Sequence, residues 1–436
     1  MIRFNKQNNK ISTTSSFYYN EEISFYVLIL GSLASGNTQI FNISKTEKVL
    51  NLIGILKQFG IKIEIDGDNI IVEGKNKKFE EPTNIIDVKN SKETLYLLVG
   101  LFASYNFKLF FRGDNSLQNL NLDDIFSCYS DLDVKFIARN DKNLPFLMYG
   151  NKSIKPIKKN VLNLKKSLLL TSLSSGKNII IEKSLQANYL ENMFKFFDVY
   201  FSEKIDTNNC LGDNVTKRIS INSNVEISGK EIVIPTDVNF LNYIATLSII
   251  IPDSNITIPN VLLDQFNDAF IRTLFDYGAN ITLLNRKINY GYSVADVSIK
   301  HKWLKTANVV INRIDKIINE YYLLFLIASV TGVSTRIQGI EYLEKNDNEN
   351  YKFMLNLLKD LGVNYTEKND ILSINGKIAN LDHKINTTDI TNINLLLTLG
   401  AFGLFLNNKV EINDVIIEKR YPNFVENLKS IGVEVE

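Results

Sequence analysis

Two adjacent lysines stand in front of an apolar stretch and could contact a phosphate group. Lys165 and Lys166 precede residues 168–170, which are all leucine. An ammonium group carries a full positive charge and three hydrogen-bond donors, which suits phosphate recognition. The alternative is the solvated start of a helix, with both side chains in water. The sequence favours the solvated helix start over the phosphate contact.

A second group of interest consists of aromatic residues near the N-terminus: Phe17, Tyr18, Tyr19, Phe25 and Tyr26. Aromatic walls with few polar groups are typical of small-molecule pockets, so these side chains could line one. Aromatic packing that holds two parts of the chain together explains the cluster equally well. Both interpretations stay open.

Metal and redox chemistry find little support in the sequence. Cys128 and Cys210 are the two cysteines, and His301 and His383 are the two histidines. These are too few for a zinc cage or a disulfide framework. No glycine-rich phosphate loop or nucleophile elbow occurs either. We therefore expect neither a metal site nor a cofactor.

Charge and hydropathy exclude further classes of protein. The chain has 49 basic and 48 acidic residues, so no global field favours nucleic acid or an anionic membrane. The longest apolar runs, residues 321–330 and 395–406, are shorter than the roughly 20 residues that a membrane span needs. The polar N-terminal segment lacks the apolar core of a signal peptide. A cytoplasmic protein is expected.

The elements that must position these residues recur six times. In each copy an apolar stretch ends at a small or turn residue, a short strand follows, and an amphipathic stretch ends at Gly or Asp before another strand. A repeat of this length indicates stacked supersecondary modules. The copies span residues 36–65, 106–137, 176–201, 253–283, 332–366 and 408–436.

Each module contains two predicted helices of different kinds. One is apolar on all sides and therefore buried, as in residues 26–34 and 240–251. The other is amphipathic, as in residues 48–59. At 436 residues two domains are expected, so we divide the modules three and three. One lobe comprises residues 1–19 and 232–436, the other residues 20–231, with chain crossings near 13–20 and 222–235 and a cleft between the lobes.

Several motifs resemble the 5-enolpyruvylshikimate-3-phosphate (EPSP) synthase family over nearly the whole chain. Residues 87–103, DVKNSKETLYLLVGLFA, resemble the family's DxGNSGTTMRLLAGLLA without a gap. Further matches are FRGDNSL at 111–117, IPTDVNFLNYIATLSI at 234–249, YSVADVSIKHKWLK at 292–305 and KRYPNFVENLKSIGVEVE at 419–436. The resemblance implies an α/β protein with the two-lobed enolpyruvyl-transferase fold, an inside-out α/β barrel. It also implies a shikimate-pathway 3-phosphoshikimate 1-carboxyvinyltransferase.

The family's reaction requires a ring of cations. Shikimate 3-phosphate and phosphoenolpyruvate are both anions, and Lys and Arg must offset their mutual repulsion through charge-assisted, often bidentate hydrogen bonds. A carboxylate and an ammonium group then move protons. When the family's positions are transferred to this sequence, most of the Lys and Arg residues of that ring are missing.

In the SKSxSxR segment, Glu21 stands at the Lys and Tyr26 at the Arg. Lys92 replaces a glycine that admits phosphoenolpyruvate, and Tyr96 replaces an Arg. We therefore expect a neutral or negative potential around Glu21 and Glu22. The remaining replaced positions are Ser116, Val161, Leu162, Ile318, Asn319, Asn346, Asn350 and Thr391.

Some family positions keep a usable side chain. The resemblance implies substrate contacts for Lys419, Asp237 and Asn163, and an acid role for Asp347, or for Glu320 if the register shifts by one. Lys92 and Lys165 could serve a less anionic ligand. We expect a monomer that has lost the original reaction, with a small molecule in the cleft if it binds anything. The alternatives are an enzyme or binding protein for another ligand, and an active synthase with an atypical site.

Overall fold

The structure is a computed structural model, and it describes residues 1–154, 157–158, 164–177, 179–180, 189–206, 216–221, 226–263, 268–309 and 311–436. The chain divides into two compact units. Unit 1 comprises residues 1–20 and 235–436, and unit 2 comprises residues 21–234. The boundaries expected from the sequence differ from these by one to three residues.

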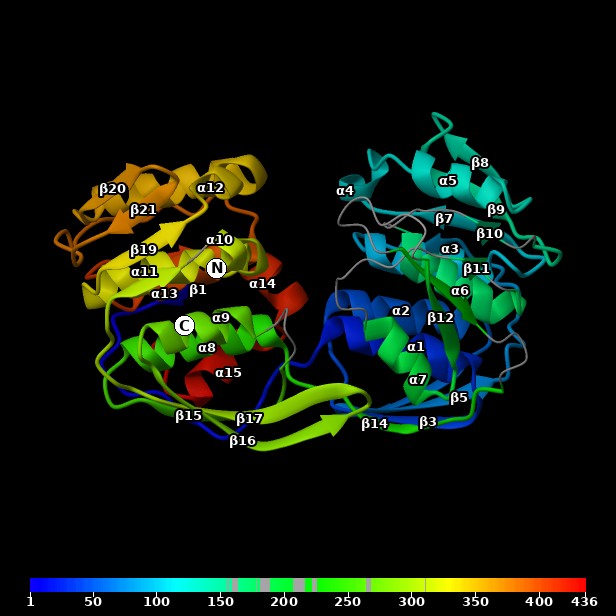
Figure 1. Cartoon of the computed structure of the whole chain (residues 1–436), viewed down its shortest axis with the longest axis horizontal. Coiled ribbons are helices and arrows are strands. Elements are labelled where there is room, and N and C mark those ends of the chain that lie inside the picture. Colours follow the sequence, from blue (N-terminus) through cyan, green and yellow to red (C-terminus); the bar gives the residue numbers. More distant parts are fainter. Residues whose placement is uncertain are drawn as a thin grey trace. The chain divides into compact units, whose positions relative to one another are not determined.

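Unit 2 alternates helices and short strands (Figure 1). Its described helices are α1 (Glu21–Leu33), α2 (Glu47–Gln58), α3 (Lys92–Phe102), α4 (Asn115–Gln118), α5 (Asp123–Ser130), α6 (Lys165–Ser175) and α7 (Tyr189–Phe196). Its described strands are β3 (Ser35–Phe41), β4 (Lys62–Asp66), β5 (Asn69–Lys75), β6 (Ile86–Asp87), β7 (Lys108–Arg112), β8 (Lys135–Arg139), β9 (Asn143–Tyr149), β10 (Ile157–Lys158), β11 (Ile179–Ile180), β12 (Phe201–Asp206), β13 (Thr216–Ile221) and β14 (Glu231–Val233).

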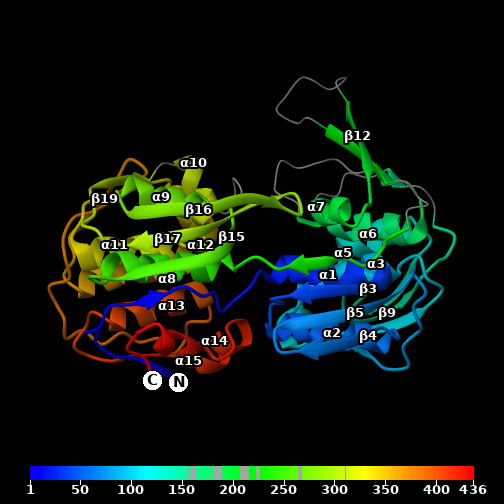
Figure 2. The same cartoon turned by 90° about the horizontal axis from the view of Figure 1, so that it is seen from below.

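Unit 1 has the same alternation and contains both termini (Figure 2). Its described helices are α8 (Val238–Ile250), α9 (Ala269–Asp276), α10 (Ile311–Ile314), the 3-10 helix η3 (Asp315–Ile317), α11 (Tyr321–Thr331), α12 (Ile340–Asp360), α13 (Ile393–Gly403), α14 (Asp414–Arg420) and α15 (Phe424–Ser430). Its described strands are β1 (Ile2–Phe4), β2 (Ser12–Thr13), β15 (Asn255–Leu262), β16 (Asn280–Asn289), β17 (Tyr292–Lys300), β18 (Ala307–Val309), β19 (Thr335–Gln338), β20 (Tyr365–Lys368), β21 (Ile371–Ile374) and β22 (Val410–Ile412).

Four modules build four-stranded sheets of identical topology. Their strand orders are β14-β3-β5-β4, β6-β7-β9-β8, β2-β15-β17-β16 and β18-β19-β21-β20. In each sheet the first two strands are parallel and the other two pairings are antiparallel. In the last module β22 pairs with β1 from the N-terminus. The repeated sequence pattern thus corresponds to a repeated structural unit.

The apolar helices are buried on every side, as their composition predicts. Every residue of α1 from 23 to 33 and every residue of α11 from 321 to 330 is buried. Helices of the second kind, such as α2, bury one face and begin at a cap: the side chain of Thr46 accepts a hydrogen bond from the backbone N–H of Val49. A polar residue stands at or directly before the start of each of the helices α1, α3, α6, α8, α11 and α13, which brings polar groups to their N-termini.

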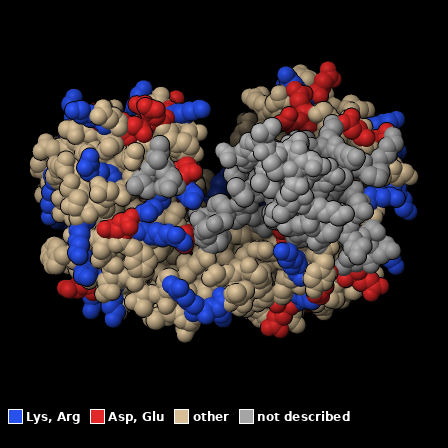
Figure 3. Space-filling model, in the orientation of Figure 1, with Lys and Arg blue, Asp and Glu red and all other residues tan. Residues whose placement is uncertain are grey.

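Charged side chains of both signs are interspersed among the described residues on the face shown in Figure 3. In the described part of the chain, no helix is long and apolar enough to cross a membrane. The same residues contain no group of three or more His, Cys, Asp or Glu side chains that could hold a metal ion.

Candidate functional site

In unit 2, the N-terminal turns of three buried helices meet at a charged cluster. The Lys166 ammonium group in α6 lies 2.7 Å from Oε1 of Glu22 in α1 and 3.0 Å from Oε1 of Glu93 in α3. Tyr26 donates a hydrogen bond of 2.5 Å to Glu22, and its hydroxyl is 3.3 Å from Glu93. We call Glu22, Tyr26, Glu93 and Lys166 the Lys166 cluster.

The cluster fixes the protonation states of Lys166 and Tyr26. Burial lowers the pKa of Lys166, but the charges of Glu22 and Glu93 outweigh this and the pKa is raised, so the ammonium stays charged. Burial, followed by the same two carboxylates, raises the pKa of Tyr26 well above its ordinary value. Tyr26 is therefore a neutral hydrogen-bond donor. One cation between two carboxylates leaves the cluster with a net charge of about −1.

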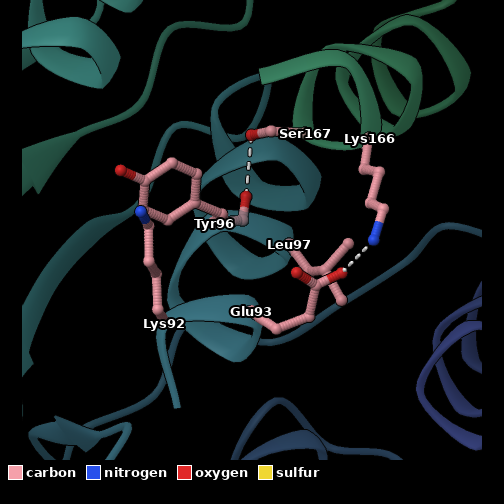
Figure 4. Close-up of a pocket in the computed structure, with 6 residues that line it drawn as sticks. All are labelled: Lys92, Glu93, Tyr96, Leu97, Lys166 and Ser167. Carbon is pink, nitrogen blue, oxygen red and sulfur yellow. Dashed lines mark hydrogen bonds and ion pairs between the residues drawn. The ribbon is translucent and has the colours of Figure 1, made fainter. Parts of the chain in front are cut away.

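A cavity of about 310 Å³ lies beside the cluster (Figure 4). It is lined by Lys92, Glu93, Tyr96, Leu97, Lys166 and Ser167. The Lys92 ammonium is 5.2 Å from the centre of the Tyr96 ring, a distance at which cation and ring attract each other. Ser167 donates a hydrogen bond of 2.7 Å to the Tyr96 carbonyl. The cavity thus has cations on both sides, of which Lys166 already has carboxylate partners.

Lys165 takes no part in this cavity. Its ammonium lies 2.7 Å from Oε1 of Glu191 in α7, and each side chain is only 7% exposed. Successive residues of a helix point about 100° apart, so Lys165 is directed into the protein while Lys166 is directed to the cavity. A solvated helix start is therefore wrong for Lys165. A role in substrate binding would require this buried pair to open.

The other sequence-predicted positions of unit 2 are not among the described contacts of the Lys166 cluster, or they lie outside the described residues. Glu21 is the first residue of α1 and is partly buried. Ser116 is exposed in α4, where its hydroxyl donates to Asp114 at 2.6 Å. Asn163, with residues 161 and 162, lies outside the described residues.

In unit 1, the N-termini of α8, α11 and α13 also carry polar groups. Asp237 caps α8 by accepting a 2.9 Å hydrogen bond from the Phe240 backbone and forms an ion pair of 2.5 Å with Arg420. Glu320, just before α11, accepts a bond of 3.3 Å from Asn242. Asn392 caps α13, and its side chain donates to Tyr322 at 3.1 Å.

Asp347 lies in a cluster of phenol and amide donors. It accepts hydrogen bonds from the hydroxyls of Tyr321, at 2.9 Å, and of Tyr322, and from the Asn350 side chain, at 2.7 Å. Its backbone is non-helical within α12, at φ −150° and ψ 43°. Burial, together with the Asp347 charge, raises the pKa of both tyrosines. Asp347 and Asn350 are thus brought together, although no cation is among these hydrogen-bond partners.

Comparison with known proteins agrees with this architecture. The model of the EPSP synthase (3-phosphoshikimate 1-carboxyvinyltransferase) family matches residues 20–428. The chain belongs to the EPSP synthase family. A 3-phosphoshikimate 1-carboxyvinyltransferase of Petrotoga mobilis is 29% identical, covering 94% of this chain and 95% of the relative. The corresponding protein of Carboxydothermus hydrogenoformans is 27% identical, with 94% of each covered.

Solved structures support the fold. EPSP synthase from Acinetobacter baumannii has a TM-score of 0.86 at 19% identity, covering 100% of this chain and 99% of that chain. The enolpyruvyl transferase NikO from Streptomyces tendae has a TM-score of 0.67 at 11% identity, covering 100% and 98%. The predicted two-lobed enolpyruvyl-transferase fold is confirmed. No described sheet closes into a barrel.

Three further EPSP synthase family positions lie in unit 1. Ile318 is partly buried and packs against the core of unit 1. Thr391 is exposed before α13. Lys419 is exposed in the last turn of α14.

Sequence reasoning missed two charged residues at these helix ends. Lys166 was named together with Lys165 as a possible phosphate contact, but Arg420 was noted only as the neighbour of Lys419. Glu93 was not considered at all. Its place in the NSKET segment, directly beside a replaced glycine position, was the available signal for this residue.

Glu320 should make stability depend on pH. Burial, the largest cause, raises its pKa from 4.5 to about 7, so the folded state holds the proton more tightly than the unfolded state. This contribution is fully present below pH 4.5 and is lost as pH rises to about 7. The loss is about 3 kcal/mol or less, because a difference of one in pKa between the folded and unfolded states corresponds to about 1.4 kcal/mol.

Glu320→Gln should therefore remove this dependence. Urea denaturation at pH 5 and pH 8 should show the variant gaining stability relative to the parent protein at the higher pH. Glu341→Gln, at an exposed position, is the control. An equal difference between variant and parent at both pH values would show that the Glu320 pKa is ordinary.

Proposed function

We propose that this EPSP synthase homologue no longer transfers the carboxyvinyl group of phosphoenolpyruvate to shikimate 3-phosphate. The observation that carries the proposal is the Lys166 cluster. At the segment where the family signature has a Lys and an Arg, this chain has Glu21 and Tyr26. The Lys166 ammonium group, 5.6 Å from the centre of the Tyr26 ring, is held by Glu22 and Glu93.

Electrostatics at the helix N-termini supports this proposal. The N-terminus of a helix is a site of positive potential that favours anions. In unit 2 the carboxylates of Glu22 and Glu93 lie in the first turns of α1 and α3 and offset that potential from within the protein. A phosphate approaching Lys166 would have to displace a carboxylate at 2.7 Å and would be repelled by it. Lys166 compensates the charge of these acids without becoming available to a ligand.

Unit 1 contributes a similar arrangement. The Arg420 guanidinium already pairs with Asp237, whose side chain is 5% exposed. Asp347 has three hydrogen-bond donors from Tyr321, Tyr322 and Asn350. Such groups can bind a neutral or weakly charged ligand more readily than two anions, because no cation has to be freed.

A second candidate function is binding or conversion of a different, less anionic ligand. The cavity of about 310 Å³ beside Lys92 and Tyr96 favours it. Glu320, with a pKa of about 7, could exchange a proton near neutral pH. We propose Lys92 and Lys419 as ligand contacts and Asp347 or Glu320 as the acid in that case. The interlobe cleft, a cytoplasmic location and a monomeric state stay predictions of the sequence.

The test is release of inorganic phosphate when the purified chain is given both substrates. We expect none above the blank. Steady release that depends on both substrates would instead favour the active synthase with an atypical site.

A further inference from the structure

We propose that unit 1 contains a second binding site, for a small amphipathic carboxylate with a hydrocarbon body. The site is a cavity of about 620 Å³ beside Trp303, which we call the Trp303 cavity. Its volume lies within the range of about 300–1,000 Å³ that is usual for small-molecule pockets. It is separate from the helix N-termini described above and does not depend on the proposed function.

The Trp303 cavity lies where three buried helices end. Its wall includes Ile249 and Ile250 of α8, Val330 and Thr331 of α11, and Phe405 just after α13. Because α8 has 13 residues and rises about 1.5 Å per residue, the cavity is roughly 20 Å from the Asp237 cap at its other end. Further apolar walls come from Pro252, Leu304, Val333, Ile378 and Leu381.

The charged groups at this cavity are all basic. Lys6, Lys302 and Lys377 line it, and no Asp or Glu is among its described lining residues. Lys6 donates to the Asn407 side chain at 3.0 Å. Within the described part of the chain, neither Lys302 nor Lys377 forms an ion pair, and both are exposed. This charge distribution is complementary to an anion.

The helix ends determine how such an anion would lie. The carbonyl groups at a helix C-terminus carry partial negative charge and disfavour a carboxylate. The ligand's head group should therefore lie at Lys302 and Lys377, and its hydrocarbon body should point toward the ends of α8, α11 and α13. Apart from the three lysines, the described lining side chains that can form hydrogen bonds are those of His301, Trp303 and Thr331, so a polyhydroxy ligand would lose more contacts with water than it regained.

Trp303 gives this site its largest apolar surface. It is 86% exposed, although a tryptophan can bury 150–250 Å² when it is covered. His301 holds the loop in place: its ring contacts Trp303 edge to face at 5.8 Å between centroids, and its Nδ1 lies 3.0 Å from the Ile249 carbonyl oxygen. A hydrocarbon body in the cavity would cover this ring.

Trp303 is the one tryptophan of the chain, so its fluorescence reports on this site alone. The probe is octanoate, added below its micelle concentration to the full-length protein. We expect a saturable blue shift of the emission as the ring becomes covered. 1-Octanol, with a chain of the same length and no charge, should bind about tenfold more weakly.

The lysines are tested by the double variant Lys302→Gln/Lys377→Gln, which should bind octanoate about tenfold more weakly. Lys305→Gln is the matched control, because Lys305 is exposed on the same loop and does not line the cavity. Trp303→Phe, followed by calorimetry, separates loss of signal from loss of binding. The proposal is overturned if octanoate causes no saturable shift, if octanol binds as tightly, or if the double variant matches the control. If the double variant matches the control, Lys302 and Lys377 only balance the partial negative charge of the carbonyl groups at the helix ends.

Discussion

Shikimate 3-phosphate and phosphoenolpyruvate should each bind at least a thousandfold more weakly to this chain than to an EPSP synthase with the family's cations. A hydrogen bond to a charged group contributes roughly 1.5–3 kcal/mol, so losing three such contacts costs about 5 kcal/mol or more. At about 1.4 kcal/mol per tenfold, this corresponds to more than three orders of magnitude in the dissociation constant. Repulsion by Glu22 adds to the loss.

Isothermal titration calorimetry measures this affinity directly. Each substrate should give only heats of dilution up to millimolar concentrations. EPSP synthase from Acinetobacter baumannii, titrated in the same buffer, is the positive control. Saturable binding of either substrate at submillimolar concentration would mean that Lys166 or Arg420 exchanges its carboxylate partner for the ligand, and the account of unit 2 would have to be abandoned.

Lys165→Met should lower the free energy of unfolding by about 3–5 kcal/mol. The variant removes the ammonium group that lies 2.7 Å from the buried Glu191 carboxylate, and removing one partner of a buried ion pair is strongly destabilising. Replacing both partners, in Lys165→Met/Glu191→Leu, should recover most of the loss because neither charge of the pair is then left in the interior. Urea denaturation of the two variants provides the measurement.

The control for this experiment is Lys177→Met. Lys177 follows the same helix and is exposed, so its replacement should change stability by less than about 1 kcal/mol. If Lys165→Met behaved like this control, the pair with Glu191 would contribute little. If the double variant were less stable than Lys165→Met, the interior would require the ion pair rather than merely tolerate it.

The repeated modules could be predicted because burial dictates composition over a whole helix. A helix that is surrounded by protein must be apolar on all sides, which is visible in residues 23–33 without knowledge of any contact. The predicted starts of these helices were too late by as many as five residues. Glu21, Lys92 and Lys165 are the first residues of α1, α3 and α6, and an apolar run cannot reveal a first turn that is made of charged residues.

The charged cluster could not be predicted from the sequence in the same way. Lys166 contacts Glu22 across 144 positions and Glu93 across 73, and such pairings depend on how the helices pack. The choice between Lys165 and Lys166 depends on which face of α6 is inside. Every residue of α6 from 167 to 173 is buried, so the sequence pattern does not show which face of this helix points inward. A family motif could show that cations were missing, but it could not show which residue had taken their place.

The central claim is that Lys166 and Arg420 are held by carboxylates of the chain itself and that the family reaction is lost. The most direct measurement is a coupled assay of inorganic phosphate on the purified protein with both substrates. A second sample contains a trace of the Acinetobacter baumannii enzyme, which shows that the mixture supports the reaction. We predict release only in the second sample. Release by this chain alone, proportional to its concentration and abolished when either substrate is omitted, would contradict the claim.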